Sequence, residues 1–201
     1  MKPQPKMRQT ELPAFFALLF ARLFAVLFTV LFTVLFTVVA ALVATPALAA
    51  LPVAYAPIVV QPTGLPERAE FDLSEAQQRA QREGKRLYVY LGASDCPFCR
   101  RYEAFLDANA QELLPHFAPY LVVDLRSSLR IHGEKLFIRV GQRSLPYLEF
   151  QQSIGDARTR QVVYPSVWLF DSKIKPLMQM PAGTGTFQTV PEQLEILRLE
   201  Q

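Results

Sequence analysis

The chain of 201 residues contains two cysteines, and they stand three positions apart in the segment Cys96-Pro-Phe-Cys99. A disulfide between residues this close closes too short a loop to restrain the unfolded chain much, although a purely structural bridge stays an alternative. Two such thiols can form and break a disulfide reversibly. A structural zinc site needs four ligands, and the chain offers only His116 and His132 besides the cysteines. We therefore expect thiol–disulfide chemistry without a resident metal or other cofactor.

The residues around the pair predict a strand, a short loop and a helix. Residues 86–91 (RLYVYL) are β-branched and aromatic, and Pro97 suits the first turn of a helix, where its missing N–H costs nothing. The unpaired N–H groups and the dipole of a helix start favour thiolate over thiol. We therefore expect Cys96 to be an attacking nucleophile and Cys99, one turn further in and less exposed, to be the resolving thiol.

The wider pattern from residue 71 onward alternates helices with short apolar strands, which predicts a three-layer α/β architecture. The expected elements are a helix opened by Asp72 and Glu75 and stopped at Gly84, strands at 86–91, 121–125, 166–170 and 176–180, and a closing helix over 190–200 with a capping box at Thr189 and Glu192. Between them we expect a hairpin turning at His132-Gly133 and a helix from Ser144-Leu-Pro146 to about Gly155.

This order, with RLYVYLGASDCPFC before the first long helix and YPSVWLFD at a later strand, resembles the thioredoxin-like superfamily, most of all its exported bacterial members of the Dsb and SoxW-like type. The resemblance covers roughly residues 71–201, with 126–160 as an insertion or enlarged middle section. It implies a central mixed sheet flanked by helices and a protein-disulfide oxidoreductase activity. It also implies a cis Pro165 facing the cysteine pair, with the backbone of Tyr164 presented to substrate.

The sequence departs from that family at positions near the thiols. Many members carry a buried acid six residues before the first cysteine, where this chain has Tyr90, and a tryptophan just before it, where this chain has Asp95. Asp95 is either a proton acceptor or an exposed loop residue, and its charge opposes a thiolate at Cys96. The Pro97-Phe98 pair resembles the Pro-Tyr of glutaredoxins, which favours reduction over oxidation.

The N-terminal quarter has the character of a targeting segment. Residues 23–44 carry no charge and would span a bilayer as a helix, and the basic residues before them predict that the rest of the chain is exported. The Ala47-Leu-Ala49 pattern suits cleavage after Ala49, whereas the length of the apolar run suits an anchor. We expect residues 1–49 to be a signal peptide or membrane anchor, residues 50–70 to be a proline-rich linker, and the domain to lie in the periplasm or at the outer face of the membrane.

Charge excludes one class of partner. The pI near 8.9 comes mostly from the N-terminal segment, because residues from 50 onward carry 17 basic and 17 acidic side chains. A neutral domain gives no reason to expect nucleic acid as a partner. We expect protein dithiols and disulfides as substrates and a membrane protein as redox partner.

The sequence thus favours an exported oxidoreductase that reduces or isomerises protein disulfides. An oxidant that donates disulfides is the first alternative, because the sequence does not set the direction of electron flow. The second is a non-enzymatic assembly factor or a copper chaperone of the same fold, with Met178 and Met180 as soft ligands.

Overall fold

The structure is a computed structural model that describes residues 22, 28, 50–155, 161–179 and 189–198. Residues 1–46 and 47–201 form separate units, and the fold is that of the second. Within the described ranges, none of the helices has both the length and the apolar character needed to cross a membrane. The targeting segment expected at 1–49, with its apolar run and its Ala49 cleavage site, lies outside the described residues apart from Arg22 and Phe28.

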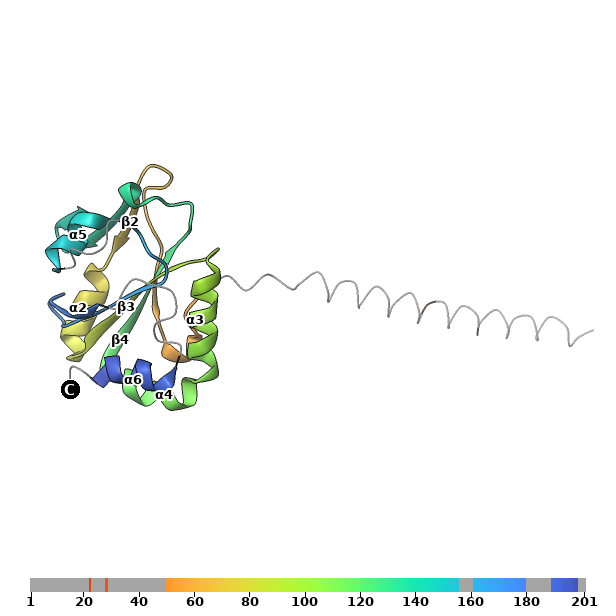
Figure 1. The fold of residues 1–201 in the computed structure, drawn as a ribbon. Coiled ribbons are helices and arrows are strands. Elements are labelled where there is room, and N and C mark those ends of the chain that lie inside the picture. The colour runs from red at the N-terminus through yellow and green to blue at the C-terminus, as the bar shows by residue number, and fades with distance from the viewer. Residues whose placement is uncertain (1–21, 23–27, 29–49, 156–160, 180–188, 199–201) are drawn as a thin grey trace, which may run out of the picture. The chain divides into compact units, whose positions relative to one another are not determined.

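A five-stranded mixed sheet forms the centre of the domain (Figure 1). Its strands lie in the order β1-β4-β3-β7-β8, in which β1, β4 and β3 run parallel while β7 is antiparallel to both β3 and β8. The strand bounds are Ile58–Val60 for β1, Arg86–Ala93 for β3, Tyr120–Ser127 for β4, Ser166–Phe170 for β7 and Pro176–Gln179 for β8. Each strand expected from the sequence between 86 and 180 is present.

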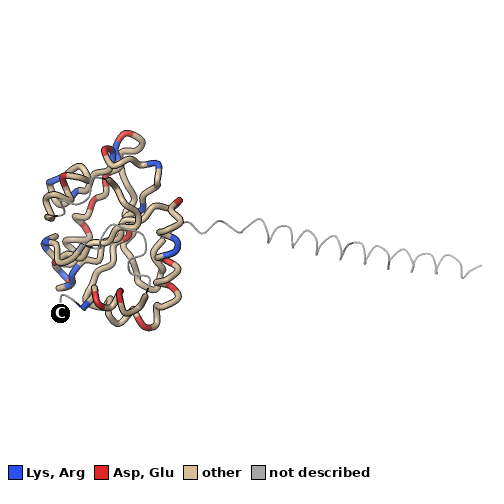
Figure 2. The backbone as a smooth tube through the Cα atoms, viewed as in Figure 1, with Lys and Arg blue, Asp and Glu red and all other residues tan. Residues whose placement is uncertain are grey.

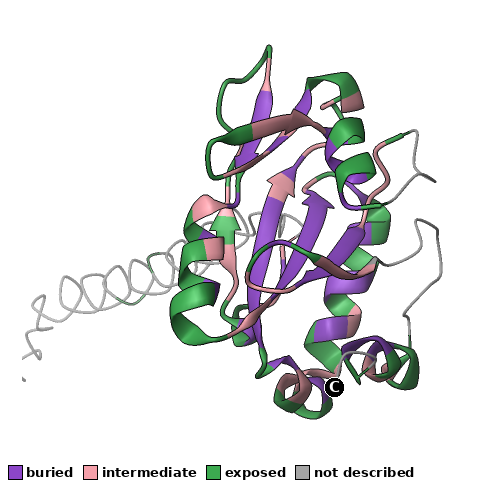
Figure 3. Ribbon diagram, turned by 90° about the vertical axis from the view of Figure 1, so that its left-hand side faces the viewer, coloured by how far each residue is buried: buried purple, intermediate pink, exposed green. Residues whose placement is uncertain are grey.

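Helices cover both faces of this sheet, which confirms the three-layer prediction. The helices are α2 (Ser74–Glu83), α3 (Pro97–Ala108), α4 (Ala110–Phe117), α5 (Tyr147–Ser153) and α6 (Val190–Arg198). Leu87, Val89 and Leu91 alternate with Tyr88 and Tyr90 along β3, so each face of that strand enters a different core. One core includes residues of α2 and α5, and the other includes residues of α3, α4 and α6. Figure 3 shows the buried strands between helices that are exposed on their outer sides.

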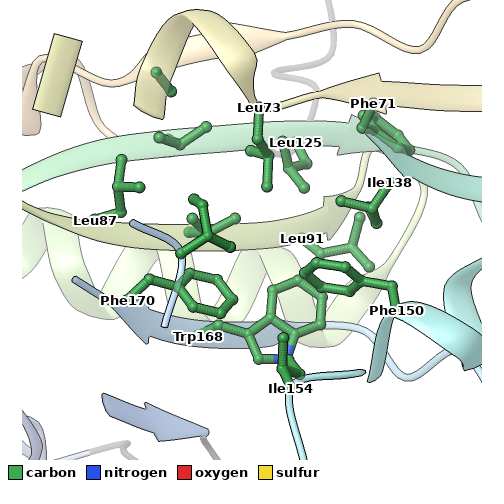
Figure 4. Packing of buried hydrophobic residues seen from close by; sticks show 14 of the residues in the cluster. Phe71, Leu73, Leu87, Leu91, Leu125, Ile138, Phe150, Ile154, Trp168 and Phe170 are labelled. Carbon is green, nitrogen blue, oxygen red and sulfur yellow. The ribbon is translucent and has the colours of Figure 1, made fainter. Parts of the chain in front are cut away.

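Aromatic residues fill much of the first core. The ring of Trp168 on β7 packs edge-on against Phe150 of α5, with ring centroids 5.9 Å apart, and Phe150 also meets Phe170 (Figure 4). Such pairs contribute beyond the apolar area that they bury. This packing holds α5, which belongs to the middle section of the chain, against the central sheet.

The middle section has its own small sheet. Strands β5 (Leu136–Val140) and β6 (Arg143–Pro146) form a hairpin, and β5 pairs in parallel with β2 (Ala69–Asp72). The hairpin turns at Gly141, whose φ of 58° suits glycine, so the turn expected at His132-Gly133 was wrong. Gly133 instead begins a 3-10 turn, η2 (Gly133–Lys135), that leads into β5.

The expectation of a linker over residues 50–70 was also wrong. These residues form a 3-10 turn, η1 (Val53–Tyr55), the edge strand β1 and the start of β2. The prolines lie outside the three-residue run of β1, which is β-branched and pairs in parallel with β4. Leu51 and Tyr55 are buried as well, so residues 51–60 belong to the folded domain.

Local start and stop signals differ from the sequence prediction in one detail. Gly84 ends α2 with a φ of 64°, as expected. The helix starts at Ser74, one residue later than predicted, with Leu73 at the N-cap, and the Ser74 N–H donates to the Asp72 carboxylate at 2.8 Å. At α6 the Glu192 carboxylate accepts from the Thr189 N–H at 3.2 Å, which is half of the predicted capping box.

Basic and acidic residues are interspersed along the described chain, as Figure 2 shows. A cluster of them stabilises the small sheet, where the Glu70 carboxylate accepts from Arg68, Arg139 and Ser144. This cluster joins β2 to the hairpin across 69 or more residues of sequence. It therefore fixes the middle section to the N-terminal part of the domain.

Candidate active site

Cys96 stands at the N-cap of α3, three residues after the end of β3. Its N–H donates to the carbonyl of Ala93 at 3.1 Å, and its Sγ accepts from the N–H of Cys99 at 3.3 Å. Pro97 occupies the first helical turn, as predicted. The sulfur of Cys96 therefore accepts from one of the N–H groups that have no backbone partner in the first turn of a helix.

Cys99 lies one turn further into α3, and both cysteines are buried, with exposed fractions of 0% for Cys99 and 2% for Cys96. The Cys99 Sγ accepts from the N–H of Ala93 at 3.4 Å. Burial, together with the neighbouring Cys96, raises the pKa of the Cys99 thiol to about 12. Cys99 is therefore protonated at neutral pH and must lose its proton before it can act as a nucleophile.

Tyr164 and Pro165 meet the cysteine pair in space. The peptide bond between them is cis, as the resemblance implies, and the Cys96 Sγ lies 3.9 Å from the Tyr164 carbonyl oxygen across 68 residues of sequence. The Tyr164 side chain packs against both cysteines, and its hydroxyl shares a hydrogen bond of 2.7 Å with Ser127 Oγ at the end of β4. Three elements thus converge on the thiols: the end of β3, the start of α3 and the loop before β7.

The two other candidate residues of the loop and helix start face outward. Phe98 is 43% exposed between the two cysteines, with the guanidinium of Arg101 over its ring. The Asp95 carboxylate accepts from the Leu129 N–H at 2.7 Å and from Ser128 Oγ at 3.2 Å, and these bonds hold the pKa of Asp95 below its ordinary value. Asp95 thereby ties the cysteine loop to the segment after β4.

A buried tyrosine next to Cys99 and a buried glutamate bonded to it were not among the candidate site residues expected from the sequence. The Tyr90 hydroxyl donates to Glu103 Oε1 at 2.7 Å, and its polar group lowers the pKa of the neighbouring Cys99 thiol against the larger effect of burial. Burial raises the pKa of both Tyr90 and Glu103, the latter being 6% exposed. Glu103 lies four residues after Cys99, so the two side chains share one face of α3. That spacing is the signal that could have identified it.

Gly92 makes room for the Tyr90 ring. A Cβ placed on Gly92 would lie 2.4 Å from Cε1 of Tyr90 and 2.7 Å from its hydroxyl oxygen. No side chain tolerates such a contact, so the tyrosine, its hydroxyl bonds and the missing side chain at Gly92 form one arrangement.

Gly92→Ala should therefore lower the free energy of unfolding by about 1–3 kcal/mol, the usual cost of overpacking a core. Urea unfolding of the purified protein measures it. In a Tyr90→Val background, which lacks the ring, the same alanine should cost much less. An equal cost in both backgrounds would show that Gly92 serves some purpose other than accommodating Tyr90.

No group of three or more His, Cys, Asp and Glu side chains within the described residues is placed to hold a metal ion. Met178, named above as a soft ligand, is half-buried on β8 and packs against the second core. Met180 lies outside the described residues.

Strand order, the cysteine pair at the start of α3 and the Tyr164–Pro165 bond opposite it define a thioredoxin-like fold. No family model and no curated protein matches the chain. A solved thioredoxin-fold protein from Helicobacter pylori is similar at 18% identity and a TM-score of 0.38, over 59% of this chain and 70% of that one. The pneumococcal exposed lipoprotein thioredoxin from Streptococcus pneumoniae strain TIGR4 is similar at 18% identity and a TM-score of 0.33, over 59% and 87%. Similarities this distant do not support the fold assignment, which rests on the strand order and the position of the cysteine pair.

Proposed function

We propose that the protein is a thiol–disulfide oxidoreductase in which Cys96 attacks and Cys99 resolves. The observation that carries this proposal is the unequal placement of two neighbouring thiols. Cys96 caps α3 beside the carbonyl of Tyr164, whereas Cys99 is sealed beneath it with its proton held. A purely structural pair would need no such difference.

The proposed reaction moves two electrons from the protein to a substrate disulfide. The Cys96 thiolate attacks one substrate sulfur, the substrate S–S bond breaks, and the other substrate sulfur leaves as a thiolate. Cys99 then loses its proton and attacks the Cys96 sulfur. The mixed disulfide breaks, the second substrate thiolate leaves, and an intramolecular Cys96–Cys99 disulfide remains. Run backward, the same steps donate a disulfide to a reduced substrate.

Tyr90 and Glu103 supply a route for the proton of Cys99. With Glu103 ionised, the tyrosine hydroxyl donates to the carboxylate, which leaves the tyrosine oxygen able to take up the proton of the neighbouring Cys99 thiol. When the thiol proton moves to the tyrosine oxygen, the tyrosine proton moves to Glu103. Cys99 becomes a thiolate, and Glu103 becomes a neutral acid. Burial favours this neutral acid, because it raises the pKa of Glu103.

The surface beside Cys96 suits an extended peptide. The Tyr164 backbone can pair with such a chain as another strand would. A hollow of about 690 Å³ beside Tyr164 is lined by Leu129, Ile131, Tyr147, Leu148 and Val162, among others. Leu129, Leu148 and Phe98 are 42–49% exposed. Apolar side chains of a substrate, next to its reacting cysteine, could pack against this hollow and these exposed residues.

We further propose that the protein works outside the cytoplasmic membrane, in the manner of exported Dsb and SoxW-like proteins. The basic start and the apolar run at 23–44 support export. A membrane protein would then reset the oxidised pair. The Pro97-Phe98 dipeptide favours the reducing or isomerising direction, with oxidation as the alternative.

The reduction potential of the Cys96–Cys99 pair tests the direction. Equilibration with glutathione buffers, read by thiol alkylation and mass, should place it nearer the ~−270 mV of thioredoxin than the ~−120 mV of a strong oxidant. A Cys96→Ser variant is the control, because it forms no intramolecular disulfide. A value close to −120 mV would reverse the proposed direction, and a pair that never equilibrates would remove the enzymatic function.

A further inference from the structure

Two buried carboxylates lie where the folded domain begins. Glu103 of α3 is 6% exposed and Asp124 of β4 is 1% exposed. The backbone N–H of Ala50 donates to Glu103, and the N–H of Leu51 donates to Asp124 Oδ2 at 3.2 Å. The other oxygen of Asp124, Oδ1, is buried and accepts no hydrogen bond from the described residues. A buried carboxylate oxygen without a partner is costly and calls for an explanation.

The charges of this cluster do not balance. The charge of Asp124 raises the pKa of Glu103, and Arg126 is the cation that the described residues place there, with its Nε 2.8 Å from Asp124 Oδ2. One cation therefore serves two acids. Buried charges are normally paired, because an unpaired one loses its hydration without compensation. Among the residues that the structure describes, no second cation pairs with Glu103 or with the unpartnered Oδ1 of Asp124.

The backbone at Ala50 is held in place by the fold. Leu51 and Tyr55 are buried, and the Tyr55 hydroxyl donates to the carbonyl of Leu106 on α3 at 2.8 Å. A few residues later, β1 pairs with β4 from Ile58 opposite Val123. Contacts within the domain therefore fix the position of the Ala50 nitrogen near the carboxylates.

The same nitrogen follows the small-residue pattern Ala47-Leu-Ala49, after which a signal peptidase would cut. Hydrolysis of the Ala49–Ala50 bond consumes one water, leaves a carboxylate on Ala49 and turns the Ala50 amide into an α-ammonium group. That group carries one positive charge and three donors where the amide has one. It would supply a second cation beside Glu103, the carboxylate to which the Ala50 nitrogen already donates.

We propose that the chain is cleaved between Ala49 and Ala50, and that the new α-ammonium group of Ala50 binds Glu103 and Asp124 as an ion pair inside the mature domain. Glu103, Asp124, Arg126 and the ammonium group then form a neutral cluster. Cleavage then adds an ion pair to the folded domain, besides separating the domain from the N-terminal segment. A consequence that rests on the proposed function is that the ammonium group keeps Glu103 ionised, ready to accept the Cys99 proton through Tyr90.

The first test is the N-terminus of the protein made from the full chain in an exporting bacterium. Intact mass and N-terminal sequencing should show a mature chain that starts at Ala50. The control is Ala49→Leu, which removes the small residue before the cut and should leave the chain unprocessed. A retained N-terminal segment, or a mature chain that starts elsewhere, would overturn the proposal.

The second test is the pKa of the Ala50 α-amino group in the processed protein, followed by NMR after reductive ¹³C-methylation. We expect it about 1–3 units above the ordinary ~7.7–8.0, because two carboxylates favour the charged form. Asp124→Asn or Glu103→Gln should lower it, whereas Glu112→Gln, an exposed acid on α4, should not. An amine that titrates at its ordinary pKa would contradict the ion pair. Neither test involves thiol exchange, so each stands apart from the proposed function.

Discussion

Cys96→Ser should reduce disulfide-reducing turnover to the uncatalysed rate, whereas Cys99→Ser should leave the first attack intact and stop the reaction after it. Both thiols are buried, but they differ in position: Cys96 lies at the helix start beside Tyr164, and Cys99 lies one turn deeper with a pKa of about 12. Without Cys99, nothing in the protein attacks the Cys96–substrate bond, so the mixed disulfide persists. Insulin reduction with dithiothreitol as the electron source measures turnover. Non-reducing gels of exporting cells should show higher-mass bands for Cys99→Ser that reductant removes.

The double variant with serine at both positions is the matched control, and it should give neither turnover nor bands. If Cys99→Ser is folded and abundant yet forms no mixed disulfide, the enzymatic proposal fails. An assembly factor or copper chaperone that uses the fold as a binding module would then be favoured. If instead Cys96→Ser accumulates the bands, the assigned roles of the two thiols are reversed.

The sequence predicted the parts of the fold that depend on local signals. The aromatic and β-branched run of β3, the loop after it and Pro97 at the start of α3 lie next to one another in the chain, and all of them formed as expected. The pairing of β2 with β5 was not predictable in this way, because it joins segments 67 residues apart at Ala69 and Leu136. Proline content suggested a linker before residue 70, but three β-branched or apolar residues sufficed for an edge strand beside β4.

The residues of the candidate site also differ in whether the sequence could predict them. The cysteine pair and Pro165 are conspicuous in sequence, and the fold brings them together. Glu103 was missed because a charged residue in an amphipathic helix is normally assigned to the exposed face. Asp124 was missed because it interrupts an apolar run, LVVDL, and only the β3–β4 register places it opposite Tyr90. Tertiary structure therefore brings Tyr90, Glu103 and Asp124 together, and the Cys99–Glu103 spacing is the part of this arrangement that the local sequence reveals.

Tyr90→Phe and Glu103→Gln should each slow the resolving step by about 10²–10⁴, the usual contribution of a positioned proton-transfer group. Tyr90→Phe removes only the hydroxyl, so the ring still fills the space over Gly92. Cys99 is fully buried, and water has no ready access to its proton. The first attack by Cys96 should be unchanged, because its sulfur has no contact with either residue among the interactions described.

Rapid mixing of reduced protein with a chromogenic disulfide separates the two steps. The first thiol is released at the attack rate, and the second is released when Cys99 resolves the mixed disulfide. The control is Tyr120→Phe, which loses the hydrogen bond of another buried tyrosine, to the Leu197 carbonyl, at the far end of β4. It should leave both rates unchanged.

Two features distinguish a proton route from a merely structural role. Raising the pH should restore the resolving rate in Glu103→Gln, because hydroxide can remove the thiol proton as the pH approaches the pKa of Cys99, about 12. The double variant should be no slower than either single one, because both residues serve one proton transfer and their effects do not add. Equal slowing of both thiol releases, or independent losses that multiply in the double variant, would assign Tyr90 and Glu103 to packing. The Cys99 proton would then leave by another path.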